Sequence, residues 1–162
     1  MRGIACGEGP ARIIVKLGQH RSFPMAVRIL IADDDVSIRR LLRRLLESHP
    51  EWKVCGDACN GDEVIQQAAE LSPDVVVLDL AMPKRNGLQA AREINHFLPD
   101  VPMLLLTVQQ VSTELIKEAT RAGFRGAVSK DNGKEVVRAI ESLLNRQRFF
   151  EPAVIDAYGR MA

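Results

Sequence analysis

Short uninterrupted apolar runs alternate along the chain with longer segments in which apolar residues return every three or four positions. The runs at 27–32, 75–78 and 103–106 are dominated by Val, Ile and Leu. Runs of this kind are typical of strands that are buried on both faces of a parallel sheet. A weaker run at 53–57 and a short one at 126–129 complete a prediction of five strands.

A helix is predicted after each strand. The clearest covers residues 36–48. Its apolar residues have the spacing i, i+3, i+4, i+7, i+8, which places them on one face of a helix, and this face is expected to be buried. These residues are Ile38, Leu41, Leu42, Leu45 and Leu46. The other predicted helices lie at 62–71 with Asp62 as its cap, and at 88–97, 112–121 and 134–145. Strands that alternate with helices of this length predict an α/β fold with a doubly wound parallel sheet.

The length of 162 residues favours a single domain. Residues 1–24 hold four basic side chains and one acidic side chain and show no sustained periodicity, so a poorly ordered extension is predicted there. Residues 25–148 are predicted to form the domain. Residues 149–162 are predicted to be a C-terminal tail or linker stub.

Composition narrows the class of protein. The chain is 46% hydrophobic and 27% charged with a formal net charge of +1, which is ordinary for a soluble protein and offers no clustered basic face for nucleic acid. No apolar stretch approaches the ~20 residues that span a bilayer. Its three cysteines form no CxxC pair, which predicts reduced thiols. A cytoplasmic protein without membrane contact is therefore predicted.

Polar residues of different chemical types stand where the predicted strands end. Asp33 and Asp34 follow the first strand, Asp79 the third, Thr107 the fourth and Lys130 the fifth. Because the carboxyl ends of parallel strands lie on one edge of a sheet, these side chains are expected to converge. Carboxylates gathered in one place repel each other and call for a cation. The pattern therefore predicts metal-assisted chemistry on phosphate.

These residues resemble the receiver domains of two-component response regulators, over about residues 27–145. The resemblance implies a flavodoxin-like (βα)5 fold with the strand order 2-1-3-4-5. The matching segments are Ile29-Leu30-Ile31-Ala32-Asp33-Asp34, Asp79-Leu80-Ala81-Met82-Pro83 with Gly87, Leu106-Thr107 and Ser129-Lys130.

The resemblance also implies roles for individual residues. Asp79 would accept a phosphoryl group from a histidine kinase or phosphotransfer protein, Lys130 would neutralise the phosphoryl oxygens, and Thr107 would hydrogen-bond one of them. Mg²⁺ is the implied cofactor, since it favours oxygen ligands in a partly hydrated octahedral site. Its implied ligands are Asp33, Asp34, Asp79 and the backbone carbonyl of Ala81, with Asp35 left off the metal.

Two positions depart from the usual receiver pattern. Ala127 stands where receivers usually carry an aromatic ring that reports phosphorylation, so either Phe124 supplies a ring or the output surface is coupled differently. Asp131 stands where proline often follows the lysine. The pair Lys130-Asp131 and the segment 135–140 resemble receivers of LuxR-type regulators. Those regulators continue into a helix-turn-helix domain, which leaves a stand-alone receiver and a missing output domain as alternatives.

The function expected from this resemblance is a phosphorylatable switch, not an enzyme, that acts on a partner or an output domain in transcriptional control. DNA would be bound only through such an output domain, and homodimerisation stays open. The alternative is a receiver-like interaction module that is not phosphorylated. An aspartate-nucleophile phosphohydrolase is disfavoured because Ala81 stands where such enzymes carry an acid. Ala81 and Gln109 are expected to tune the lifetime of the phosphorylated state.

Overall fold

A computed structural model describes residues 25–151 of the chain. The predictions made for residues 1–24 and for residues after 151 lie outside the described residues. Within the described range, strands and helices alternate in this order: β1 (Val27–Ala32), α1 (Val36–Glu47), β2 (Trp52–Ala58), α2 (Gly61–Leu71), β3 (Val75–Asp79), α3 (Gly87–Phe97), β4 (Met103–Thr107), α4 (Thr113–Ala122), β5 (Gly126–Ser129), α5 (Gly133–Leu144) and β6 (Phe149–Phe150).

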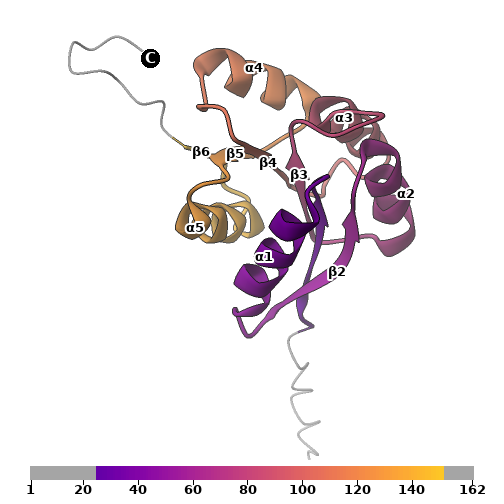
Figure 1. Cartoon of the computed structure of the whole chain (residues 1–162), viewed down its shortest axis with the longest axis vertical. Coiled ribbons are helices and arrows are strands. Elements are labelled where there is room, and N and C mark those ends of the chain that lie inside the picture. Colours follow the sequence, from indigo (N-terminus) through magenta and orange to yellow (C-terminus); the bar gives the residue numbers. More distant parts are fainter. Residues whose placement is uncertain (1–24, 152–162) are drawn as a thin grey trace, which may run out of the picture.

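The strands form one parallel sheet in the order β2-β1-β3-β4-β5-β6. Helices α1 and α5 cover one face of this sheet, and α2, α3 and α4 cover the other (Figure 1). Every residue of β3 and β4 is buried between the two helical layers, as the apolar runs predicted. The doubly wound parallel α/β fold is therefore confirmed. Among residues 25–151, no helix is long and apolar enough to cross a membrane.

The predicted count of five strands is wrong, because β6 adds a sixth. Phe149 N donates to Arg125 O at 3.0 Å and Glu151 N donates to Ala127 O at 2.9 Å, so β6 pairs with the outer edge of β5. Two adjacent aromatic residues show no periodicity, and for this reason the sequence placed them in the tail. Their pairing covers the backbone of a strand that would otherwise be the edge of the sheet.

Each helix begins at a capping side chain in the loop that precedes it. The prediction of Asp62 as the cap of α2 is wrong. Asn60 Oδ1 accepts a hydrogen bond from Glu63 N at 2.9 Å, and Asp62 lies in the first turn. The strand β2 runs on to Ala58, which leaves Asn60 in the extended backbone conformation that a cap requires. The other caps are Asp35 for α1, Asn86 for α3, Ser112 for α4 and Asn132 for α5.

The predicted apolar stripe of α1 is buried only in part. Leu42 and Leu46 are buried against the sheet, whereas 61% of Leu41 is exposed. Leu41 lies at the margin of the helix face that meets the sheet. Its side chain instead lines an apolar hollow between α1 and the start of α5. The periodicity identified the face correctly and overestimated its width.

Leu46→Ala is expected to lower the free energy of unfolding by about 2–5 kcal/mol, because it leaves a cavity in the core between α1, α5 and the sheet. Leu46 is fully buried in that core. The control is Leu41→Ala in the same helix, which should change stability by about 0.5 kcal/mol or less, as is usual for exposed sites. Urea denaturation measures both; equal losses would contradict this assignment of the buried face.

Candidate functional site

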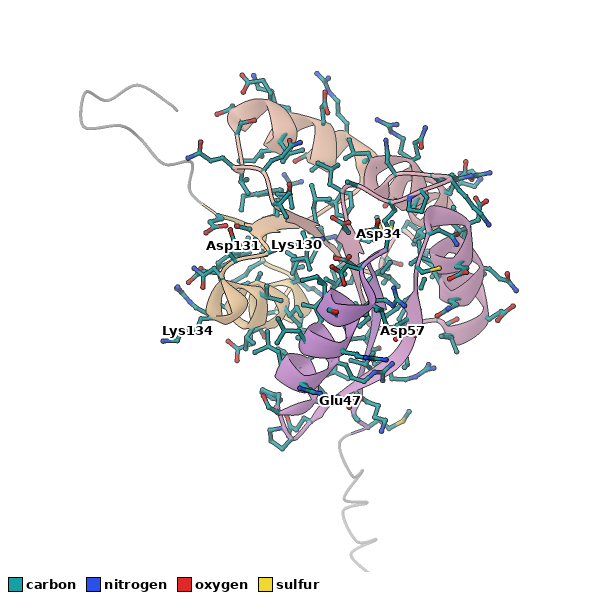
Figure 2. All side chains as sticks on the ribbon, in the orientation of Figure 1. Asp34, Glu47, Asp57, Lys130, Asp131 and Lys134 are labelled. Carbon is teal, nitrogen blue, oxygen red and sulfur yellow. The ribbon has the colours of Figure 1, made fainter. Side chains whose placement is uncertain are left out.

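Three carboxylates converge at the carboxyl edge of the sheet. Asp33 follows β1 and is fully buried, Asp79 is the last residue of β3 and is 4% exposed, and Asp34 is exposed. One carboxylate oxygen from each lies within 4.8 Å of the others. Figure 2 shows Asp34 at the same edge of the sheet as Lys130, while Glu47 lies at the far end of α1. The predicted convergence of these strand ends is present in the structure.

Lys130 joins this cluster from the end of β5. Its ammonium Nζ lies 2.5 Å from Asp33 Oδ2 and 3.1 Å from Asp79 Oδ1, and only 10% of its side chain is exposed. Its backbone N donates to Thr107 O at 2.9 Å, which ties the end of β5 to the end of β4. One cation therefore bridges two buried anions that would otherwise repel each other.

Burial dominates the electrostatics of this cluster. It raises the pKa of the Asp79 carboxyl above its ordinary value, and repulsion from Asp33 acts in the same direction. The Lys130 ammonium and the backbone N–H of Ala81 partly offset that rise by stabilising the carboxylate. Burial also works against the charge on Lys130, but its contacts with Asp33 and Asp79 outweigh burial and raise the pKa of Lys130.

The cluster fits a hard divalent cation. Asp33 Oδ2 is buried, and among the described residues its one polar partner is the Lys130 ammonium at 2.5 Å. The cleft around it also contains Asp34, Asp79 and Ala81, so carboxylate oxygens reach it from two strand ends. A partly exposed all-oxygen set is the kind of site that suits Mg²⁺, which keeps several waters.

The loop after β1 is held by two residues with structural roles. Asp35 N donates to Asp33 Oδ1 at 2.9 Å, and Asp35 Oδ1 in turn accepts from Ser37 N at 2.7 Å. Asp35 is thus occupied in capping α1 and is not in the carboxylate cluster. Arg39 donates from its guanidinium to Asp33 O at 2.7 Å and fixes the backbone of the loop.

The sequence did not single out Arg39 for this role. In the sequence, Arg39 is one of four arginines in the predicted helix 36–48, with Arg40, Arg43 and Arg44, and nothing in their spacing sets it apart. The guanidinium of Arg43 lies 3.5 Å from Asp57 and 3.5 Å from Glu47. Two of the four arginines are therefore used within the fold, whereas Arg40 and Arg44 are exposed. Arg39 and Arg43 differ from Arg40 and Arg44 only in the contacts that they make in the folded chain.

Thr107 ends β4 beside the cluster and is 1% exposed. Its Oγ1 accepts a hydrogen bond from Gln109 N at 2.9 Å. Since the hydroxyl is the acceptor in that bond, its hydrogen can still be donated to another group. Gln109 contacts Thr107 through its backbone N, and Gln109 is exposed.

The loop after Asp79 folds back over the end of β3, and Gly87 makes this possible. Gly87 N donates to Leu80 O at 2.9 Å. A Cβ at position 87 would lie 2.3 Å from Asp79 O, which is closer than real atoms approach. Any larger residue there would push the loop away from Asp79. The glycine seen in the sequence motif is therefore required by a close backbone contact.

The two candidates for an aromatic ring lie in different places. Phe124 is 2% exposed and is part of the core between the sheet and α2, α3 and α4. Ala127 is fully buried and is paired in register with Phe150 of β6. Phe150 packs against the same core cluster as Ala127. The sequence missed this neighbour because it missed β6.

A family model described as "Response regulator receiver domain" matches residues 29–141. The chain belongs to this family. It is 37% identical over 115 residues to the transcriptional regulatory protein LnrK of Bacillus subtilis, a match that covers 70% of this chain and 52% of LnrK. It is 33% identical over 132 residues to the response regulator GacA of Pseudomonas viridiflava, which covers 79% of this chain and 60% of GacA.

Another relative is named as an enzyme. A protein-glutamate methylesterase/protein-glutamine glutaminase of Methanosarcina acetivorans is 36% identical over 126 residues, which cover 75% of this chain and 35% of that protein. The chain therefore spans between about a third and three-fifths of the curated relatives named here.

Two solved structures show the same fold at appreciable identity. A LuxR-family response regulator from Aurantimonas sp. SI85-9A1 has a TM-score of 0.75 at 33% identity, covering 78% of this chain and 91% of that chain. The response regulator domain of Thermotoga maritima CheB has a TM-score of 0.68 at 27% identity, covering 74% of this chain and 97% of that chain. These likenesses confirm the resemblance that the strand-end residues indicated.

In metal-free buffer, Asp79→Asn is expected to raise the free energy of unfolding at pH 7. Because the pKa of Asp79 is raised on folding, the folded state keeps its proton where the unfolded state has lost it, and stability falls as the pH rises through that range. Asparagine does not titrate. Its advantage should therefore be full above the raised pKa and vanish below the ordinary value of 3.8.

Urea denaturation at a series of pH values measures this difference. The same exchange at the exposed Asp100 is the control and should leave the pH dependence of the wild type unchanged. A lower stability of Asp79→Asn at neutral pH would contradict the prediction. It would mean that the contact with Lys130 outweighs the cost of burying the carboxylate.

Proposed function

We propose that this receiver domain accepts a phosphoryl group on Asp79 from a histidine kinase or phosphotransfer protein, and that phosphorylation switches a partner or an output domain. The observation that carries the proposal is the ion pair between Lys130 and Asp79 beside two further carboxylates. Phosphoryl transfer depends on positioning and on neutralising charge. The cluster offers a nucleophile, a fixed cation and an oxygen-rich cleft within one site.

The transfer step exchanges one bond to phosphorus for another. The N–P bond of a phosphohistidine breaks, an O–P bond to an Asp79 carboxylate oxygen forms, and the freed imidazole nitrogen keeps the electron pair and takes up a proton. Bound Mg²⁺ would neutralise phosphoryl charge, held by Asp33, Asp34, Asp79 and the Ala81 carbonyl. Lys130 would neutralise the phosphoryl oxygens, and the Thr107 hydroxyl would donate a hydrogen bond to one of them.

The names of two relatives support a role in transcriptional control. LnrK is named a transcriptional regulatory protein and GacA a response regulator, and this chain covers only part of each. We infer that the domain works in the cytoplasm, that DNA would be bound only through an output domain, and that its chemistry is limited to receiving and slowly losing the phosphoryl group. Homodimerisation through the receiver is a second arrangement to be tested.

Incubation with Mg²⁺ and acetyl phosphate should add one phosphate per chain, and Asp79→Asn should abolish the gain. Lys130→Ala should slow the gain about a hundredfold, as expected when a preorganised donor to the developing charge is removed. Intact-protein mass spectrometry follows the reaction. Asp100→Asn, which alters an exposed carboxylate away from the cluster, is the matched control and should react like the wild type.

Two results would sink this proposal. Phosphorylation that survives Asp79→Asn would place the acceptor elsewhere. A folded wild type that gains no phosphate would favour the alternative, an interaction module that works without phosphorylation. In that case, binding to a partner should be insensitive both to acetyl phosphate and to Asp79→Asn.

Asp34→Asn is expected to weaken Mg²⁺ binding about tenfold, since losing one unit charge near a divalent cation costs about 1 kcal/mol or more. Asp34 is exposed, so the substitution should leave the fold intact. Isothermal titration calorimetry measures the affinity. Asp131→Asn, at the rim of the same cleft but outside the carboxylate cluster, is the control and should bind Mg²⁺ nearly as the wild type does.

A further inference from the structure

Strand β6 brings a carboxylate close to the end of β5. The backbone of β6 pairs with β5 as far as Glu151, whose N donates to Ala127 O at 2.9 Å. Beyond that point the side chain of Glu151 continues the pairing. Its Oε2 accepts a hydrogen bond from Ser129 N at 2.6 Å. The carboxylate therefore takes the place of the next backbone carbonyl in the ladder.

The hydrogen bond from Ser129 N to Glu151 is short. Its donor–acceptor distance is 2.6 Å, just below the usual range of about 2.7–3.2 Å for N–H···O hydrogen bonds. The two residues are part-buried, which limits competition from water. Ser129 Oγ also accepts from Asp131 N at 3.3 Å, so the turn that follows β5 is held on both sides of Lys130.

Lys130 depends on this backbone for its place in the cluster. On the inner side, its N donates to Thr107 O of β4 at 2.9 Å. On the outer side, the preceding residue is held by Glu151. The end of β5 is therefore fixed between β4 and β6. From this position the Lys130 ammonium contacts Asp33 and Asp79.

Glu151 is not itself a member of the carboxylate cluster. It lines a separate polar hollow together with Ser129, Asp131 and the segment 108–111 that follows Thr107. The contact through which Glu151 can act on the position of Lys130 is its hydrogen bond to Ser129 N. If the hydrogen bond between Glu151 and Ser129 N positions Lys130, its loss should change the affinity for the phosphoryl group that Lys130 would bind.

We propose that Glu151 is a positioning residue for Lys130, which makes the C-terminal strand β6 part of the phosphorylation site. This inference rests on the proposed function. By thermodynamic reciprocity, a phosphoryl group that is bound through Lys130 stabilises the docking of β6 to the same extent. The state of the site is thus coupled to the docking of β6.

The test compares the binding of beryllofluoride, a phosphoryl analogue, by the full chain with Mg²⁺. Glu151→Ala should weaken beryllofluoride binding about fivefold to tenfold, as expected for the loss of one charge-assisted hydrogen bond that places Lys130. Glu151→Gln keeps a carbonyl acceptor for Ser129 N but not its charge, and should bind more tightly than Glu151→Ala and less tightly than the wild type. Glu141→Ala, an exposed glutamate on α5, is the matched control.

Mg²⁺ affinity without beryllofluoride separates positioning from general damage. Lys130 is not an implied Mg²⁺ ligand, but its ammonium lies beside two of them, Asp33 and Asp79. Displacing that cation should leave the Mg²⁺ affinity unchanged or raise it, so Glu151→Ala should not lower this affinity. Fluorine NMR reports bound beryllofluoride, and calorimetry reports Mg²⁺. The inference is overturned if Glu151→Ala binds beryllofluoride like the wild type, if Glu151→Gln is as weak as Glu151→Ala, or if Mg²⁺ affinity falls in parallel.

Hydrogen exchange on the wild type tests the reciprocal effect without any substitution. Bound beryllofluoride should slow exchange of the Glu151 amide, which donates to Ala127 O. Unchanged exchange in a chain shown to bind beryllofluoride would overturn the inference and leave the proposed function standing. A wild type that binds no beryllofluoride would contradict the proposed function itself, and the inference would fall with it.

Discussion

The ion pairs of Lys130 with Asp33 and Asp79 are the constraint around which this end of the molecule is built. Two carboxylates are buried at adjacent strand ends, where leaving their charges without a partner would cost free energy. One ammonium lies between them and offsets that cost. The loops after β1, β3 and β5 are each fixed by backbone hydrogen bonds, because this arrangement tolerates little displacement.

The same constraint bears on the proposed phosphoryl transfer. In that proposal Asp79 is the nucleophile and has to be ionised, yet its pKa is raised by burial and by Asp33. Additional positive charge favours the reactive form and relieves the repulsion. A cleft in which carboxylates lie close together is therefore stabilised by binding a divalent cation.

The fold and the members of the site could largely be predicted from sequence, because both depend on strong local signals. Apolar runs located β1, β3 and β4, and a polar residue at each strand end located Asp33, Asp79, Thr107 and Lys130. What the sequence missed depends on contacts between distant segments. Arg39 is one of four similar arginines until its bond to Asp33 O is seen, and Glu151 follows a strand too short to show a period.

The most direct measurement of the central claim is to map the phosphorylated residue. After reaction with Mg²⁺ and acetyl phosphate, the acyl phosphate is trapped by borohydride reduction, and the modified peptide is sequenced by mass spectrometry. The account predicts that the reduced residue is Asp79 alone. Modification at Asp33 or Asp34, or on a side chain other than a carboxylate, would contradict it.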